Sequence, residues 1–457
     1  MAFSCFYKTR KTQAIRLSVI PEKKYKTWLQ DQDALLVNYL TSLTFEAIAG
    51  NYVKIADQNG HFIQVVLIVS ADDMWMLGDI SKKLPAGDYI LDDPYECADS
   101  EDVYLGFGLG CYQFSHYKSK KPAKRMKLYL PKVYSHVEKT LRAIYLTRDM
   151  INTPAEDMGP AEIAHQAQKL AQTFSASFSE ITGQTLKQRY PGVYTVGRAS
   201  TRAPRVVKIH WGDKSNPHIV LVGKGVAFDT GGLDIKPSSG MLLMHKDMGG
   251  AAHVLGLARL IMDRQLPVYL TVVIPTVDNA ISGDAYRPSD IITMANGSTV
   301  EISNTDAEGR VIMADVLYEA SNLSPDLLID FATLTGAARV AVGTEIAAFF
   351  CNNQKLAKLI EQSSETTQDP VWRMPLYQPY KKLLKSDAAD MKNCALGAYA
   401  GSITAALFLE TFIEKNTNWL HFDMMGWNVQ EMPGRPKGGE AMGVRAVFDM
   451  LAKKYLE

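Results

Sequence analysis

The stretch Asn304-Thr305-Asp306-Ala307-Glu308-Gly309-Arg310 decides how the rest of the chain is interpreted. It follows a predicted hairpin over residues 290–303, which turns at Asn296-Gly297, and it precedes a helix-like run over 311–322. An Asp and a Glu two residues apart in extended chain project to the same side, where both can bind one cation or two neighbouring cations. A lone D-x-E is more often a solvated turn with a helix cap, so metal chemistry requires a second stretch.

That second stretch is HIVLVGKGVAFDTGGLDIKPSSGMLLMHKDMGGAA, residues 218–252. Its apolar start predicts a buried strand, and a glycine-rich segment with four charged side chains follows. These are Lys224, Asp229, Lys236 and Asp247. Charges in so apolar a segment are costly to bury unless they pair or coordinate a metal. With Asp306 and Glu308, the set offers three Asp, one Glu and one Lys as candidate ligands. Two divalent metals about 3.5–4 Å apart would relieve the repulsion between the carboxylates and form a hydrolytic centre.

Length and composition describe an ordinary globular protein. The chain has 457 residues, of which 47% are hydrophobic and 21% charged, with a net charge of +0. This balance gives no support for binding to nucleic acid or membrane through bulk charge. Five scattered cysteines without a C-x-x-C pair favour reduced thiols over a disulfide framework or zinc site. We find no apolar leader and no run near the ~20 residues of a membrane span, and we expect a soluble, cytoplasmic protein.

The pattern along the chain predicts two domains. Residues 1–130 read as a small α/β domain of unclear role, with strands at 62–70 and 103–111 and no chemical motif. The basic run over 118–127 is either a nucleic-acid contact or a solvated linker, and we favour the linker because it contains Pro122. We place the domain boundary in this run, so that residues 131–457 form the catalytic domain.

Apolar strands alternate with helices in the second domain. The predicted strands are 206–211, 218–227, 268–277, 327–334, 346–351 and 419–425; the predicted helices are 132–150, 161–174, 249–265 and 403–415. This alternation predicts an α/β fold with a mostly parallel or mixed sheet flanked by helices. Ligands in such sheets bind at the carboxyl ends of strands. Lys224, Asp306 and the loop 333–336 all follow predicted strands, as this rule requires.

Other catalytic motifs are weak or missing. Gly223-Lys224-Gly225 follows a strand but lacks the third glycine of a dinucleotide site and the spacing of a phosphate loop. The chain contains neither H-E-x-x-H nor G-x-S-x-G, and a nucleophilic role for Ser238 or Ser239 is disfavoured. The carboxylates and lysines are therefore the best candidates for chemistry.

Three blocks resemble the signatures of the leucyl aminopeptidase family, the M17-type cytosol aminopeptidases. They are GKGVAFDTGGLDIKP (223–237), KDMGGAA (246–252) and NTDAEGR (304–310). Further blocks fit in the same order: INTPAEDMGP, SGDAYRPSDIIT, IDFATLTGA, AGSITAALFLETFI and WLHFDMMG. The resemblance covers about residues 140–457. The first 130 residues lack comparable blocks, and family members carry a variable N-terminal domain there.

The resemblance implies two metal sites. The tighter one takes Lys224, Asp229, Asp247 and Glu308. The more exchangeable one takes Asp229, Asp306 and Glu308, with the backbone carbonyl of Asp306 as a further ligand. Asp229, Glu308 and a hydroxide would bridge the two ions. Zn, Mn, Mg and Co all suit mixed oxygen and amine ligands.

The same resemblance assigns the catalytic and pocket residues. Lys236 matches the lysine that steadies the substrate carbonyl, and Arg310 matches the arginine that holds a bicarbonate ion acting as general base. The pocket for the substrate's first side chain is implied at Met244, Thr333, Leu334, Thr335 and Gly336. Physical chemistry agrees on two points: Lys224 can bind a metal only when neutral, and the cluster offers no histidine as a base. Two departures are Thr230 and Asp234, where the family often has Ser; Asp234 adds a charge near the site.

We therefore expect a metal-dependent aminopeptidase that releases N-terminal residues, preferably apolar and Leu-like, from peptides. By resemblance it assembles as a homohexamer. Two rival functions stay open: a two-metal phosphoesterase, and a DNA-binding regulator with a vestigial peptidase site. The second would need a positive stripe beyond 118–127. Neither rival explains Lys224 among acids as well as peptidase chemistry does.

Overall fold

The computed structural model describes residues 5–70, 73–96, 100–120 and 125–456. The chain divides into two compact units, one of residues 1–141 with 430–437 and the other of 142–429 with 438–457. Residues 121–124 of the predicted basic linker lie outside the described residues. Within the described part, no helix is both long and apolar enough to cross a membrane.

The first unit is built on a six-stranded sheet in the order β1-β6-β5-β2-β4-β3. All neighbours pair in parallel except β3 and β4, which are antiparallel. The strands are β1 (Phe6–Tyr7), β2 (Ile15–Pro21), β3 (Tyr52–Ala56), β4 (Phe62–Val69), β5 (Asp88–Asp92) and β6 (Lys127–Tyr129). The helices are α1 (Tyr25–Gln30), α2 (Ala34–Ser42), α3 (Ile80–Lys83) and α4 (Ser100–Gly110).

The strand predicted at 103–111 is wrong, because these residues form helix α4. Every residue from 103 to 110 is buried, so the apolar run shows no helical alternation and cannot be told from a buried strand by its pattern. Its glycines permit contact between backbones. A Cβ on Gly106 would lie 2.0 Å from the carbonyl oxygen of Met74, and one on Gly110 would lie 1.5 Å from that of Gly78.

The second unit contains a nine-stranded mixed sheet in the order β16-β15-β18-β14-β9-β11-β8-β7, with β10 paired to β11. Its strands are β7 (Ser177–Ile181), β8 (Arg205–Trp211), β9 (His218–Gly223), β10 (Gly225–Asp229), β11 (Tyr269–Asn279), β14 (Leu327–Ala332), β15 (Ala347–Cys351), β16 (Val371–Arg373) and β18 (Trp419–Asp423). The central strands β18, β14, β9 and β11 are parallel, whereas β7, β8 and β15 each run antiparallel to a neighbour. This arrangement confirms the predicted α/β class.

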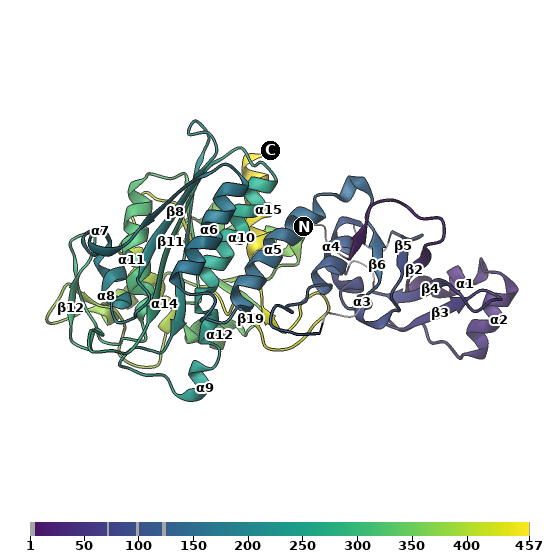
Figure 1. Ribbon diagram of the computed structural model, residues 1–457, viewed down its shortest axis with the longest axis horizontal. Helices are drawn as coiled ribbons and strands as arrows, with labels where there is room; N and C mark the ends of the chain where they lie inside the picture. Colours follow the sequence, from purple (N-terminus) through teal and green to yellow (C-terminus); the bar gives the residue numbers. More distant parts are fainter. Residues whose placement is uncertain (1–4, 71–72, 97–99, 121–124, 457) are drawn as a thin grey trace. The chain divides into compact units, whose positions relative to one another are not determined.

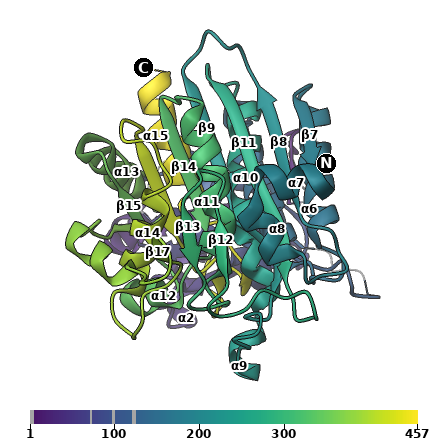
Figure 2. The same ribbon diagram turned by 90° about the vertical axis from the view of Figure 1, so that its left-hand side faces the viewer.

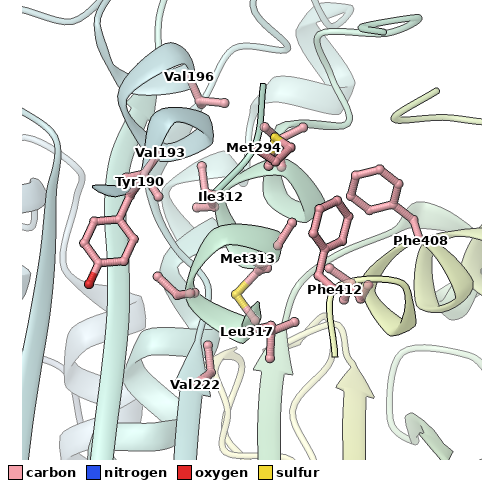
Figure 3. Close-up of a cluster of buried hydrophobic side chains, with 14 of the residues drawn as sticks. Tyr190, Val193, Val196, Val222, Met294, Ile312, Met313, Leu317, Phe408 and Phe412 are labelled. Atoms are coloured by element: carbon pink, nitrogen blue, oxygen red, sulfur yellow. The ribbon is translucent and has the colours of Figure 1, made fainter. Parts of the chain in front are cut away.

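Helices cover both faces of this sheet (Figures 1 and 2). One layer contains α5 (Val137–Asn152), α6 (Pro160–Thr173), α10 (Gly249–Asp263), α13 (Gln354–Thr367) and α15 (Val444–Tyr455); the other contains α7 (Gly183–Arg189), α8 (Pro191–Gly197), α11 (Glu308–Asn322) and α14 (Gly401–Glu410). Figure 3 shows the core between the second layer and the sheet, where Ile312, Met313 and Leu317 of α11 pack beside Val222 of β9. This packing holds the helix that begins at Glu308 against the centre of the sheet.

Smaller elements surround the carboxyl ends of the strands. They are α9 (Ser238–Met241), the 3-10 segment η4 (Met244–Met248), β12 (Ile291–Thr293), β13 (Thr299–Glu301), α12 (Gly336–Val342), η5 (Gln378–Leu384), β17 (Met391–Lys392), β19 (Trp427–Asn428) and β20 (Gly438–Gly439). β12 and β13 pair antiparallel, which confirms the predicted hairpin.

Two local predictions at the site need correction. The strand predicted over 218–227 is two strands, β9 and β10, which are separated at Lys224. The Lys224 N–H still donates to Phe331 of β14, but its carbonyl accepts from Ala251 of α10. The chain around Asp306 is a turn, and Glu308 is the first residue of α11. The two carboxylates therefore meet through a turn that enters a helix, not through extended chain.

The close packing of α10 on the sheet generates a stability prediction. A Cβ on Gly250 would lie 2.1 Å from the carbonyl oxygen of Phe331 and 2.6 Å from the amide nitrogen of Lys224. Gly250→Ala should lower the free energy of unfolding by about 1–3 kcal/mol, measured by chemical denaturation, because overpacking forces the helix away from the sheet. Gly283→Ala is the matched control, since a Cβ there meets nothing within 4 Å. Equal stability of both variants would contradict this packing.

Candidate active site

An open cavity of about 490 Å³ lies where β9, β10 and β14 end and α11 begins. Its lining contains every predicted site residue except Arg310, together with four residues not foreseen from the sequence. The predicted residues in the lining are Lys224, Asp229, Lys236, Met244, Asp247, Asp306, Glu308, Thr333, Leu334, Thr335 and Gly336. The additional ones are Lys246, Arg339, Met424 and Met425.

Four carboxylates in this cavity share two ammonium groups. The Lys224 Nζ lies 2.7 Å from Asp247 Oδ2 and 2.8 Å from Glu308 Oε1. The Lys236 Nζ lies 2.7 Å from Asp229 Oδ2 and also pairs with Asp306. The Lys224–Glu308 and Lys236–Asp306 pairs thus join, at one end of the sheet, segments that are 84 and 70 positions apart in the sequence.

Glycines leave room for the Lys224 side chain and allow the turn that brings Lys236 back to the site. A Cβ on Gly309 would lie 2.5 Å from Cε of Lys224, so the glycine of the 304–310 stretch leaves room for the lysine side chain. Gly231 and Gly232 have φ of +90° and +66°, a conformation that residues with a Cβ rarely adopt. They turn the chain back after β10, so that the Lys236 N–H donates to the Thr230 carbonyl and the ammonium returns to Asp229.

Hydrogen bonds orient the carboxylates that face the cavity. Asp229 Oδ1 accepts from Asn279 Nδ2 at 2.8 Å and from the Gly231 N–H at 2.9 Å. Thr333 Oγ1 donates to Asp247 Oδ1 at 2.7 Å. In each of these two carboxylates, one oxygen accepts hydrogen bonds from the protein. The other oxygen faces a lysine ammonium group and is therefore presented to the cavity.

The loop before α11 is held by residues that sequence analysis missed. Asn393 is fully buried; its Oδ1 accepts from the Ser303 N–H at 2.8 Å and its Nδ2 donates to the Asn304 carbonyl at 2.7 Å. Asp234 Oδ2 accepts from the Thr305 N–H at 2.7 Å. The charge of Asp234 therefore faces this loop, and Asp234 is not among the residues that line the cavity. Asn393 lies far along the chain in a segment without a motif, so no sequence signal identified it.

Burial and mutual repulsion raise the pKa values of two of the carboxyl groups. Burial, followed by the charge of Asp229, raises the pKa of Glu308 to about 8. The same two causes raise the pKa of Asp306 to about 6. Burial opposes the charge of Lys224, but Asp247, Glu308 and Asp229 outweigh it and raise the Lys224 pKa. The two lysines thus do not fully compensate the charge of the four carboxylates.

The donor set fits a divalent cation. Asp229, Asp306 and Glu308 each offer a carboxylate oxygen, and these atoms lie within 4.8 Å of one another. Glu308 Oε2 is buried and has no hydrogen-bond partner. A cation between these oxygens would supply the missing partner and reduce the repulsion that raises both pKa values. Without cations Lys224 is an ammonium group, so its expected role as a neutral ligand requires that it lose a proton when metal binds.

Arg310 stands apart from the other predicted residues. It is 5% exposed, and its Nη1 donates to the Asn393 carbonyl at 3.0 Å. Its Nε is buried without a hydrogen-bond partner. A buried, unpaired guanidinium N–H is a suitable donor to a small anion such as bicarbonate. Arg310 is not among the residues that line the cavity.

The fold and the site define an α/β protein with a buried carboxylate–lysine centre suited to divalent metal. Residues 145–448 match the model of the cytosol aminopeptidase family, catalytic domain, and residues 15–131 match the M17 aminopeptidase N-terminal domain. The chain therefore belongs to the cytosol aminopeptidase family. The second match shows that the family likeness also covers the first part of the chain, where the sequence blocks did not reveal it.

Relatives and solved structures agree with this assignment. A probable cytosol aminopeptidase of Chlamydia trachomatis is 40% identical over 330 residues, which cover 70% of this chain and 66% of the relative, just under two thirds. One of Nitrobacter winogradskyi is 39% identical, covering 78% and 74%. The cytosol aminopeptidase from Coxiella burnetii has a TM-score of 0.96 and 46% identity, covering 99% of both chains. The bottromycin maturation enzyme BotP in complex with Mn has a TM-score of 0.87 and 29% identity, covering 97% and 100%.

The buried amide of Asn393 generates a prediction about the site. Asn393→Ala should lower the free energy of unfolding by about 1–3 kcal/mol, because it leaves buried backbone groups of residues 303 and 304 without partners. Chemical denaturation measures this change. Asn416→Ala, at an exposed position, is the control and should have no effect. If Asn393→Ala were as stable as the control, Asn393 would not hold this loop.

Proposed function

We propose that this chain is a metal-dependent aminopeptidase that releases the N-terminal residue of peptides through a pair of divalent cations. The observation that carries the proposal is the set of four carboxylates around two buried lysines at the carboxyl ends of the parallel strands. The residues proposed as metal ligands are Lys224, Asp229, Asp247, Asp306 and Glu308. Membership of the cytosol aminopeptidase family supports the peptide as substrate.

Several metals suit the proposed ligands. Zn, Mn, Mg and Co all accept carboxylate and amine donors, so the ion used depends on availability. The relative BotP was solved in complex with Mn, which supports Mn as one candidate. When bound, two such ions lower the pKa of a coordinated water toward neutrality and polarise the peptide carbonyl.

The proposed catalytic residues are Lys236 and Arg310. Lys236 lies at the cavity, where Asp229 and Glu308 outweigh its burial and raise its pKa, so it stays protonated at neutral pH. A protonated lysine there can donate a hydrogen bond to the oxyanion that develops when the peptide carbonyl is attacked. The unpaired Nε of Arg310 supports its proposed role in holding bicarbonate.

The pocket for the substrate's first side chain is proposed at Met244 and residues 333–336. Met244, Leu334, Met424 and Met425 give this part of the cavity an apolar lining. Methionines adapt to ligands of different shape, which supports a preference for Leu-like residues with tolerance for others.

A homohexamer is the proposed assembly. The support in the second unit is a set of large apolar side chains that stay exposed in the single chain: Val340 is 86% exposed, Leu396 75%, Tyr399 90% and Leu242 76%. Such residues are typical of surfaces that other subunits cover.

For cellular location we keep the cytoplasm as a proposal, supported by free thiols at Cys5, Cys111, Cys351 and Cys394.

An assay with Leu-p-nitroanilide and p-nitrophenyl phosphate tests the proposed activity. After chelation and reloading with each metal in turn, the anilide should be hydrolysed and the phosphate ester should not.

Glu308→Ala should lose bound metal, measured by elemental analysis, and turnover together. Lys236→Ala should keep the metal and lower kcat, about 100-fold or more, because it removes a transition-state donor.

Glu345→Ala, at an exposed position, is the control and should retain both metal and activity. Hydrolysis of the ester without the anilide would favour the phosphoesterase instead. Full activity of Glu308→Ala would remove Glu308 from the centre.

A further inference from the structure

Lys246 is a buried cation without a partner in the wall of the cavity. Its side chain belongs to η4, and the residue is 3% exposed. Within the described part of the chain its ammonium group makes neither a hydrogen bond nor an ion pair. A buried charge in this state is costly, and proteins rarely keep one unless a ligand or partner compensates it.

The carboxylates nearest to Lys246 are already engaged. Asp247, the next residue in the chain, and Asp423 both act on it electrostatically. Asp247 accepts from Thr333 through Oδ1 and faces Lys224 through Oδ2. Asp423 accepts from the Leu334 and Thr335 N–H groups through Oδ1 and from Thr335 Oγ1 through Oδ2. Both acids therefore have other hydrogen-bond partners, and among the described residues neither forms an ion pair with Lys246.

A second cation lies near Lys246. The Arg339 guanidinium acts on Lys246 electrostatically and also lines the cavity, where its Nη1 lies 3.7 Å from Sδ of Met425. Among the described residues Arg339 forms no ion pair. Two positive side chains that repel each other across a cavity form a natural site for an anion.

The four carboxylates proposed as metal ligands pair with lysines other than Lys246. Lys224 pairs with Asp247 and Glu308, and Lys236 pairs with Asp229 and Asp306. Lys246 lines the same cavity as the Thr333–Gly336 loop, Met424 and Met425, where the first side chain is proposed to bind. Asp423, whose charge acts on Lys246, holds this loop through the Leu334 and Thr335 N–H groups. An anion bound to Lys246 would therefore belong to that side chain.

We propose that Lys246, assisted by Arg339, binds the side-chain carboxylate of an acidic N-terminal residue, so that peptides beginning with Glu are substrates beside those beginning with an apolar residue. This inference rests on the proposed aminopeptidase function. The methionines contact the methylene groups of the glutamate side chain, and the two cations pair with its carboxylate. A neutral residue of the same shape, Gln, leaves Lys246 unpaired and is bound less well.

The test compares Glu-, Gln- and Leu-p-nitroanilide with the metal-loaded enzyme. Gln matches Glu in shape and lacks the charge. We expect kcat/KM for Glu to exceed that for Gln by at least about tenfold, since a hydrogen bond to a charged group contributes about 1.5–3 kcal/mol. Lys246→Met should remove this ratio, mainly through a higher KM for the Glu substrate. Lys358→Met, at an exposed position on α13, is the control and should preserve the ratio.

The outcomes separate this inference from the function on which it rests. Hydrolysis of none of the three anilides would overturn the aminopeptidase proposal itself. If Leu-p-nitroanilide is hydrolysed but the Glu and Gln anilides have equal kcat/KM, only the role of Lys246 is overturned. The same holds if the Glu/Gln ratio is unchanged in Lys246→Met. Thermal unfolding verifies that each variant is folded. Arg339→Met, at a more exposed residue, provides the second test and should reduce the Glu/Gln ratio in part. If Lys246→Met fails to fold, an unchanged ratio in Arg339→Met would overturn the inference.

Discussion

The structure depends on one electrostatic constraint: four carboxylates are held at the carboxyl ends of parallel strands with only two lysines paired to them. Burial makes this arrangement costly, as the raised pKa values of Glu308 and Asp306 show. An oxygen of Glu308 is left without a partner. A protein built for stability alone would not need this excess of negative charge. We interpret the excess as the signature of a site that is complete only with cations.

The surrounding fold serves this constraint. Lys224 lies between β9 and β10, where its carbonyl accepts from Ala251 of α10 and its side chain passes Gly309 to reach two acids. The loop before α11 is fixed by Asn393 and Asp234, and the helix itself is anchored by the apolar core in Figure 3. Rigid elements thus position each proposed ligand, and the short loops between them contribute the contacts with the cavity.

Much of the fold and of the candidate site could be predicted from the sequence, because regular elements show a periodic pattern in the residues that form them. Alternating apolar strands and helices indicated the α/β class, and Asn296-Gly297 located the hairpin between β12 and β13. Acids placed after strands indicated which side chains meet. Helix α4 was missed because its continuous burial hides the helical period. Asn393 and Lys246 could not be identified from the sequence. The role of Asn393 depends on hydrogen bonds to a distant segment, and that of Lys246 on the lack of a partner among the described residues of the folded chain. The charged state of Lys224 depends on neighbours that only the folded chain supplies.

The most direct test is anomalous diffraction from crystals of the chain loaded with Mn²⁺. The account predicts two peaks per chain, about 3.5–4 Å apart, with carboxylates of Asp229 and Glu308 bridging them and the Lys224 amine turned from an ion pair into a ligand. It would be contradicted by crystals in the same Mn²⁺ solution that show no peak in the cavity and retain all four lysine–carboxylate pairs.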